Sequence, residues 1–307
     1  MLALCRLVVP HPFDLRSVFI CDSIGAISRD WRMSEMTAND DLERFQSGAA
    51  KYAAYLQTPE GRLRLDLAFA NVQEFLPQAT TRSLYALDIG CGTGALAVRL
   101  ARLGFHVTML DPSAEMLDMA QRAVREAEVS EHTTLKQGDA AQLANLFDAA
   151  SFDVILCHNV LEFVDDPNSV LRDAARALRD SSAILSVLVR SQAGEVLKAA
   201  LQAGDLVAAE NNLSAAWGQE SLYGGNVRLF QPDRLPTMLR EASLAIAAQR
   251  GVRIIADYLP PQVSRSAEYE RIFGLERQLG SRPEFAAVAR YTQCLARRAS
   301  PVTKDDA

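Results

Sequence analysis

The stretch ALDIGCGTGALA at residues 86–97 decides the fold, because an apolar run that ends in an acid leads into three glycines at alternate positions. Gly90, Gly92 and Gly94 have no side chains, so a ligand can lie directly against their backbone. A glycine-rich turn between a parallel strand and the next helix presents backbone N–H groups and a helix N-terminus to a ligand. The stretch therefore predicts a binding site at the start of an α/β domain.

Short apolar runs alternate with amphipathic segments along most of the chain. Strands are predicted at residues 83–89, 106–110, 133–137, 152–157 and 183–189, within 245–259, and at 288–298. Helices are predicted over about 40–56, 60–76, 94–103, 113–128, 140–148, 168–179, 232–242 and 266–279. This alternation indicates right-handed crossovers and a parallel sheet, and hence the α/β class.

A chain of 307 residues, 49% of them hydrophobic, is long enough to bury a full core. One domain over residues 39–298 accounts for the pattern, with an insertion or lid at about 191–230. No helical or strand period continues through most of residues 1–38, which are therefore predicted to be a disordered extension. Residues 299–307 are predicted to be a C-terminal tail.

The composition argues against several classes of protein. The five cysteines are scattered, odd in number and without a CxxC pair, which favours a reducing cytoplasm over a disulfide framework. The four histidines are not near one another, so no metal is expected. No apolar run approaches the roughly 18 residues that cross a bilayer, so no membrane partner is expected. A cytoplasmic globular protein is the prediction.

The net charge of −6 conceals an asymmetry along the chain. Residues 1–227 carry 19 Lys and Arg against 29 Asp and Glu, whereas residues 228–298 carry 12 arginines against 7 acids. Two interpretations of this asymmetry are equally good: the charges lie on solvated helix faces, or an anionic partner docks on the C-terminal part of the chain.

The residues around the glycines narrow the choice of ligand. A phosphate-binding P-loop is excluded because no Lys-Ser or Lys-Thr follows. The stretch GCGTGA fits the dinucleotide pattern G-x-G-x-x-[GA], and Asp111 ends the second predicted strand, where an acid binds ribose hydroxyls. Asp88, however, would repel a pyrophosphate and attract an amino group. A ligand with a ribose, an adenine and a charged amino-acid portion fits better, and S-adenosylmethionine is such a ligand.

With LDIGCGTG at 87–94, MLDPSAEMLDMA at 109–120 and FDVILCHNVLEFVDDP at 152–167, the chain resembles the class I S-adenosylmethionine-dependent methyltransferases. The resemblance implies a Rossmann-like, doubly wound sheet of seven strands, mostly parallel with an antiparallel last strand, after a helical N-terminal segment. It implies that Gly90, Cys91 and Gly92 line the methionine and ribose portions of the cofactor, and that Asp111 binds the ribose. Ala141 and Gln142 are implied to flank the adenine.

Further stretches resemble the methyltransferases that esterify 5-carboxymethoxyuridine at the tRNA wobble position. They include EGRLRLDLAF at 60–69, GVRIIADYL at 251–259 and YERIFGLERQLG at 269–280. This resemblance implies that Arg64 binds the carboxylate of the cofactor and that His158 faces the cofactor cleft. The alternatives are an Arg64 on the polar face of a helix and a His158 satisfied within the core.

Methylation of a carboxyl group makes few chemical demands, because the group is ionised at neutral pH and needs no general base. The enzyme must hold the carboxylate in line with the methyl group and exclude water. The sequence indicates no catalytic acid–base pair, and no catalytic residue is assigned. Arg190, Arg253 and Tyr258 are the candidates for steadying the acceptor, from their positions at strand ends.

The sequence of the insertion does not decide which acceptor the protein methylates. Relatives that act on tRNA carry a run of lysines and arginines there, whereas residues 214–234 offer only Arg228 and Arg234. Basic contacts to phosphate dominate RNA affinity, so this departure weakens the prediction of a tRNA anticodon loop as partner. Trp217, Tyr223 and Phe230 are expected either to stack on loop bases or to form the lid of a small-molecule pocket.

Two alternatives to the tRNA enzyme follow from the same motifs. One is a small-molecule O- or N-methyltransferase with the same cofactor site and a different lid. The other is a non-catalytic protein that binds the cofactor, against which the intact DIGCGTG at 88–94 and Asp111 argue.

Overall fold

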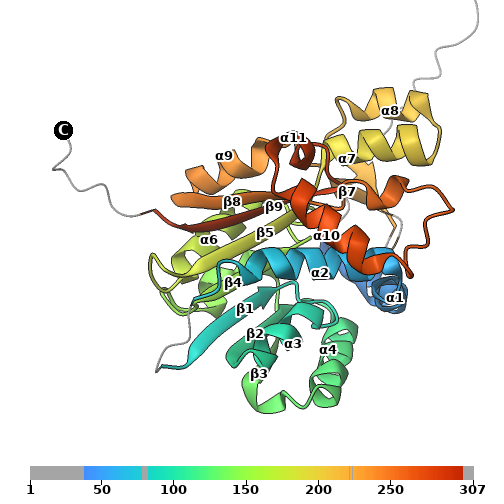
Figure 1. Ribbon diagram of the computed structural model, residues 1–307. Coiled ribbons are helices and arrows are strands. Elements are labelled where there is room, and N and C mark those ends of the chain that lie inside the picture. Colours follow the sequence, from blue (N-terminus) through green and yellow to red (C-terminus); the bar gives the residue numbers. More distant parts are fainter. Residues whose placement is uncertain (1–37, 78–81, 221, 223, 300–307) are drawn as a thin grey trace, which may run out of the picture. The chain divides into compact units, whose positions relative to one another are not determined.

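The computed structural model describes residues 38–77, 82–220, 222 and 224–299 (Figure 1). The predictions for the extension up to residue 37, for the tail from residue 300 and for Tyr223 lie outside these described residues.

The core of the fold is a seven-stranded sheet in the order β3-β2-β1-β4-β5-β9-β8. Its strands are β1 (Leu84–Ile89), β2 (Phe105–Asp111), β3 (Thr133–Gln137), β4 (Val154–His158), β5 (Ile184–Arg190), β8 (Leu244–Val252) and β9 (Tyr291–Arg298). Strands β1 to β5 pair in parallel, and β9 runs antiparallel to both of its neighbours. The predicted Rossmann-like sheet, with its antiparallel last strand, is confirmed.

Helices flank this sheet and connect its strands. They are α1 (Ala38–Leu56), α2 (Pro59–Gln73), α3 (Ala95–Arg102), α4 (Ala114–Glu126), α5 (Leu143–Leu146), α6 (Pro167–Ala177), α9 (Arg234–Glu241), α10 (Tyr269–Gly280) and α11 (Pro283–Ala286). Side-chain caps fix several helix starts, because Thr58, Ser113 and Asp166 each accept a backbone N–H of the following first turn.

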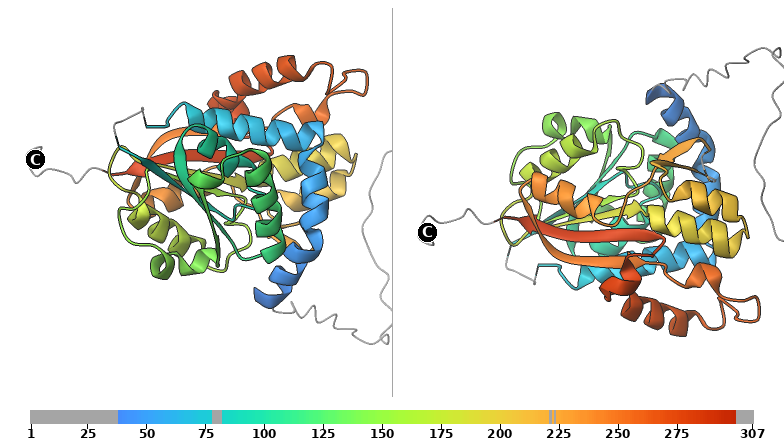
Figure 2. Two further views of the ribbon diagram at one scale, coloured as in Figure 1. Left: turned by 90° about the horizontal axis from the view of Figure 1, so that it is seen from below. Right: turned by 90° about the horizontal axis from the view of Figure 1, so that it is seen from above.

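Alternate strand residues feed two apolar layers, as a doubly wound sheet requires. On one face Leu87 and Ile155 pack with Leu171 of α6 and Leu235 of α9. On the other face Ala86 and Leu156 belong to the layer that contains residues of α2, α3 and α4. Figure 2 shows α1, in blue, crossing the end of the sheet where the parallel strands finish. That end carries the glycine turn after β1.

The insertion has more structure than the sequence predicted. It contains α7 (Gln192–Leu197), a π-helical segment η3 (Lys198–Gln202), α8 (Leu206–Asn212) and a hairpin of β6 (Trp217–Gln219) with β7 (Asn226–Arg228). The sequence pattern missed these elements because each is short, and short elements carry little periodicity.

Only the first part of the predicted stretch 245–259 is a strand. The residue that ends the strand belongs to α10. Strand β8 stops at Val252, and Arg253 adopts a left-handed φ of 61°. The buried Glu276 carboxylate accepts the backbone N–H groups of residues 254, 255 and 256 at 2.7, 2.9 and 2.8 Å. These bonds replace a strand ladder, and the chain continues into the 3-10 turn η4 (Ala256–Tyr258).

Candidate active site

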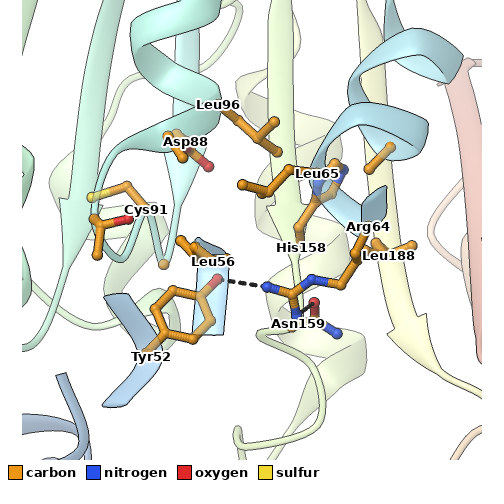
Figure 3. A pocket seen from close by; sticks show the side chains of 14 residues that line it. Tyr52, Leu56, Arg64, Leu65, Asp88, Cys91, Leu96, His158, Asn159 and Leu188 are labelled. Carbon is orange, nitrogen blue, oxygen red and sulfur yellow. Dashed lines mark hydrogen bonds between the residues drawn. The ribbon is translucent and has the colours of Figure 1, made fainter. Parts of the chain in front are cut away.

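A cavity of about 880 Å³ opens at the carboxyl ends of β1, β2, β4 and β5. We call it the large cavity. It lies where the strand order reverses between β1 and β4, which is where doubly wound sheets bind ligands. A second, small cavity of about 30 Å³ shares Tyr52, Arg64, Gly90, His158 and Asn159 with it (Figure 3).

The glycine turn forms one wall of both cavities. Gly90 has φ +64°, and a Cβ at this position would lie 2.5 Å from Cγ2 of Val160. Gly92 has φ +54°, and a Cβ there would lie 3.3 Å from the Tyr52 ring. A side chain at either position is strained and intrudes on the neighbouring wall, so the backbone itself is the surface that a ligand meets.

Asp111, at the end of β2, lies in the large cavity with its carboxylate held by the loop backbone. Its Oδ2 accepts the N–H of Gly92 at 2.8 Å, and its Oδ1 accepts that of Ser113 at 2.9 Å. Burial raises its pKa although these two bonds favour the ionised form. Each oxygen keeps a lone pair, so the group has the chemistry to accept two vicinal hydroxyls.

Asp88 and Cys91 line the small cavity rather than the large one. Asp88 is 4% exposed, and burial, followed by the charge of Asp111, raises its pKa to about 7. An ammonium group placed here would compensate the buried carboxylate, whereas a phosphate would be repelled. Burial also raises the pKa of the Cys91 thiol well above its usual value, so Cys91 contributes a neutral wall.

Arg64 projects from α2 into the junction of the two cavities (Figure 3). Its guanidinium donates to the Tyr52 hydroxyl at 2.9 Å and to Oδ1 of Asn159 at 3.1 Å. The Tyr52, Tyr55 and Tyr291 rings surround it, with centroids 5.6, 5.3 and 5.7 Å away. These contacts fix a buried cation at the cavity wall, which suits a ligand carboxylate.

His158, the last residue of β4, faces both cavities. Its Nε2 lies 2.8 Å from the Ser186 hydroxyl, while its buried Nδ1 has no hydrogen-bond partner among the described residues. Burial and the charge of Arg64 lower its pKa to about 3, so the ring is neutral at physiological pH.

The adenine side of the predicted site is a short 3-10 turn, η2 (Ala140–Gln142), which lines the large cavity. The Asp139 side chain accepts the N–H of Ala141 at 2.7 Å, and the Gln142 side chain accepts that of Asp139 at 3.5 Å. This reciprocal cap holds the exposed Ala141 and Gln142 in one conformation.

The three residues predicted to bind the acceptor do not all line the large cavity. Arg190 lines the large cavity, where its guanidinium donates to Glu220 Oε2 at 2.5 Å and lies 3.5 Å from Glu195. Arg253 and Tyr258 do not line it. Arg253 is buried against Asp257 and donates to the Tyr55 hydroxyl at 2.7 Å, so it reaches the site only through neighbours. A direct contact of Arg253 or Tyr258 with an acceptor stays a prediction.

Several lining residues were not predicted from the sequence. They are Tyr52, Asn159, Glu162, Glu220 and Tyr291. Asn159 and Glu162 lie in the motif stretch CHNVLEF, and this was the available signal for them. Glu162 Oε1 accepts the Asn159 amide at 2.9 Å and the Arg190 N–H at 2.8 Å, which ties the ends of β4 and β5 together.

The described lining of the large cavity is acidic. Six acids line it against two arginines, namely Asp111, Asp139, Glu162, Asp165, Asp166 and Glu220 against Arg64 and Arg190. The arginine excess of residues 228–298 does not offset this, because many of those arginines form ion pairs, such as Arg250 and Arg277 with Glu74. Within the described lining of the large cavity, Arg64 and Arg190 are therefore the basic side chains available for phosphate contacts.

Two further findings concern metals and membranes. Among the described residues, no three His, Cys, Asp or Glu side chains are grouped so that they could hold a metal ion. None of the helices in the described part of the chain has both the length and the apolar character needed to cross a bilayer.

The chain is similar in sequence to known proteins. A family model described as "Methyltransferase domain" matches residues 87–185, from β1 into β5. The tRNA 5-carboxymethoxyuridine methyltransferase of Escherichia coli O157:H7 is 30% identical over 254 residues, which cover 81% of this chain and 92% of that protein. That similarity is longer than the 87–185 stretch that the family model matches.

Two other similarities are shorter or lower in sequence identity. The ubiquinone biosynthesis O-methyltransferase of Maricaulis maris is 33% identical over 172 residues, which cover 55% of this chain and 62% of that protein. A solved Thermotoga maritima structure, titled a possible histamine N-methyltransferase, superposes with a TM-score of 0.55 at 16% identity, covering 84% of this chain and 99% of that one. The last likeness concerns the fold alone.

Proposed function

The chain belongs to the class I S-adenosylmethionine-dependent methyltransferases, and from this premise we propose that it methylates the carboxyl group of 5-carboxymethoxyuridine at the tRNA wobble position. The observation that carries the proposal is the extent of the similarity, which covers 81% of this chain and 92% of the E. coli tRNA enzyme. The similarity to the ubiquinone O-methyltransferase covers only 55% of this chain.

The residues of the two cavities fit the parts of S-adenosylmethionine. Asp111 offers free lone pairs to the ribose hydroxyls, and Asp88 offers a buried negative charge to the amino group. Arg64 offers a guanidinium to the carboxylate, and η2 offers a backbone edge to the adenine. When bound, the cofactor supplies an electrophilic methyl group on a sulfonium sulfur.

The chain's own task is to position the acceptor and exclude water. A carboxylate oxygen attacks with a lone pair that it already has, so no proton moves and no base is needed. The neutral His158 and the half-buried side chains of Tyr52 and Val160 shield the point where β1 and β4 end. Holding the two reacting groups in line in a site that excludes water supplies the acceleration.

A second candidate is a small-molecule methyltransferase, which the acidic lining of the large cavity favours. The exposed Asp165 and Asp166 repel the phosphates of RNA, whereas a neutral or cationic metabolite meets no such cost. For the tRNA enzyme this lining implies that only the modified base enters the cavity and that the sugar–phosphate chain stays outside it.

Transfer of labelled methyl groups tests the proposal. The protein is incubated with methyl-labelled S-adenosylmethionine and bulk tRNA from a strain that lacks this gene. The expected result is label in tRNA that mild base releases, as it releases a methyl ester. Asp111→Asn should abolish most of the transfer, while Asp118→Asn, an exposed acid on α4, should not. Label in a small-metabolite extract with none in tRNA would establish the second candidate instead.

A further inference from the structure

Tyr291 is the first residue of β9 and lies beside the end of β5. The antiparallel register pairs Tyr291 with Arg190, so both residues lie at the end of the sheet where the large cavity opens. Tyr291 lines the large cavity, although its side chain is only 4% exposed. None of the hydrogen bonds made within the described residues involves its hydroxyl.

The surroundings of this hydroxyl are cationic. Arg64 lies 5.7 Å from the ring centroid, and Arg190, Arg253 and Arg290 add their charges from β5, the end of β8 and the segment before β9. Arg190 and Arg290 both contact the buried Glu195, at 3.5 and 2.9 Å, and Arg253 is paired with Asp257. These acids hold the arginines in place, and of the five groups Arg64, Arg190 and Tyr291 line the large cavity.

We infer that Tyr291 binds the acceptor's carboxylate, donating its hydroxyl proton in a hydrogen bond to the oxygen that is not methylated, beside Arg190. This inference rests on the proposed carboxyl acceptor. The ionised acids that line the large cavity cannot donate to a carboxylate, and Arg64 belongs to the cofactor side, whereas Tyr291 lies directly opposite Arg190 in the strand register. A phenol that keeps its proton holds the anion without competing for the methyl group.

The chemical step balances without a proton transfer. One carboxylate oxygen forms a bond to the methyl carbon as the carbon–sulfur bond breaks, and the sulfur keeps the electron pair. The ester product carries no charge, so its hydrogen bond to Tyr291 is weaker than that of the carboxylate. The same hydroxyl therefore favours binding of the substrate and release of the product.

The Tyr291→Phe variant tests the assignment, because it should change the KM for tRNA but not the affinity for S-adenosylmethionine. The KM for tRNA should rise about tenfold or more, because a hydrogen bond to a charged group is lost. The dissociation constant of S-adenosylmethionine, measured by calorimetry, should change less than twofold. Tyr85→Phe, which removes an exposed hydroxyl at the opposite end of β1, should change neither. Weakened cofactor binding with an unchanged KM for tRNA would overturn the assignment.

The pH dependence gives a second readout. Burial raises the pKa of Tyr291, but the charges of four arginines together outweigh it and lower the pKa to about 8. Tyr55 and Lys198 are the other titratable neighbours, and Glu162, Glu195 and Glu220 lie around Arg190. At saturating cofactor, kcat/KM for tRNA should fall about tenfold between pH 7 and pH 9, as the phenolate forms and repels the acceptor. This fall should disappear in Tyr291→Phe. A rise through pH 8 that the variant loses would identify a base for a hydroxyl acceptor and overturn the inference.

A binding experiment separates this inference from the proposed function. The 5-carboxymethoxyuridine nucleoside and its methyl ester are titrated into the protein saturated with S-adenosylhomocysteine. The wild type should prefer the free acid about tenfold or more, and Tyr291→Phe should lose that preference. If tRNA receives no methyl group but this preference is present, the tRNA acceptor is wrong and the assignment of Tyr291 stands. Equal affinity of the wild type for acid and ester overturns the assignment itself.

Discussion

The guanidinium of Arg64 donates a hydrogen bond of 2.9 Å to the hydroxyl of Tyr52, and this bond joins α2 to α1 across the small cavity. Helix α1 is thereby part of the wall of the proposed cofactor site, because the Tyr52 ring also lies beside Gly92. The cofactor site therefore depends on a helix that precedes the first strand by nearly thirty residues.

Replacing Arg64 with alanine should weaken binding of S-adenosylmethionine by about tenfold or more, because a charge-assisted hydrogen bond to the ligand carboxylate is lost. Tyr52→Phe should weaken it less, since the guanidinium keeps its bond to Asn159 at 3.1 Å. Calorimetry of the two variants measures both effects. Arg62→Ala, on the solvent side of the same helix, is the matched control and should bind normally. An unchanged affinity in Arg64→Ala would reject the role.

The pKa of Asp88 should appear in the pH dependence of cofactor binding. Its pKa is raised to about 7 from a usual 3.8, so the carboxylate that attracts an ammonium group is lost as the pH falls below 7. The affinity for S-adenosylmethionine should fall about tenfold from pH 8 to pH 6. Asp88→Asn should bind weakly at both pH values, with a flat profile. A steep profile in this variant would assign the pH dependence to another group.

The raised pKa of Asp88 also makes the stability of the protein depend on pH. Between about pH 4 and pH 7 the folded protein holds a proton on Asp88 that the unfolded chain has released, so the free energy of unfolding falls as the pH rises. Without cofactor, Asp88→Asn should therefore melt at a higher temperature than the wild type at pH 8, and the gain should shrink toward pH 4. Thermal unfolding at several pH values measures this, and Asp118→Asn is the control.

The glycine turn and Asp111 could be predicted from the sequence because their roles are set locally. The left-handed φ at Gly90 and the end of β2 at Asp111 both follow from residues within one strand–turn–helix unit. Tyr291 could not be predicted in this way. It joins the site because β9 pairs with β5, and the pair Arg190 and Tyr291 is about one hundred residues apart in sequence. A strand pattern predicts that β9 exists but not which strand lies beside it.

The end of β8 shows the same limit in another form. The apolar pattern of residues 245–259 fits a strand, and the chain follows it only as far as Val252. Beyond that point the Glu276 carboxylate on α10 accepts three backbone N–H groups that a strand would have offered to a neighbour. One buried acid on a distant helix thus overrides the local preference.

Glu276→Gln should destabilise the protein by about 2 kcal/mol or more, because an amide replaces one acceptor oxygen with a donor that faces backbone N–H groups. Glu270→Gln, on the exposed side of the same helix, should be neutral. Chemical denaturation of the three proteins compares the free energies of unfolding. The loop that carries Arg253 should also exchange its amide hydrogens faster in Glu276→Gln, and an unchanged stability and exchange would contradict the role given to this carboxylate.

The tautomer of His158 follows from a chain of buried hydrogen bonds. Gln293 Nε2 lies 3.1 Å from the Ala68 carbonyl oxygen, which can only accept, so this atom is the amide nitrogen. The same nitrogen donates to the Ser186 hydroxyl at 2.9 Å, and the hydroxyl proton is then directed to His158 Nε2 at 2.8 Å. This arrangement uses the hydroxyl proton of Ser186 and favours the neutral ring that carries its proton on Nδ1, beside the cavities.

Nitrogen NMR of the labelled protein should show a His158 that is protonated on Nδ1, with no titration between pH 5 and pH 8, because its pKa is lowered to about 3. Ser186→Ala removes the donor to Nε2 and should shift the ring toward the other tautomer. Methyl transfer should accordingly show no step from His158 in this pH range. A His158 resonance that titrates near pH 6.5 would mean that the ring is solvated in solution, and the shielding role would then fail.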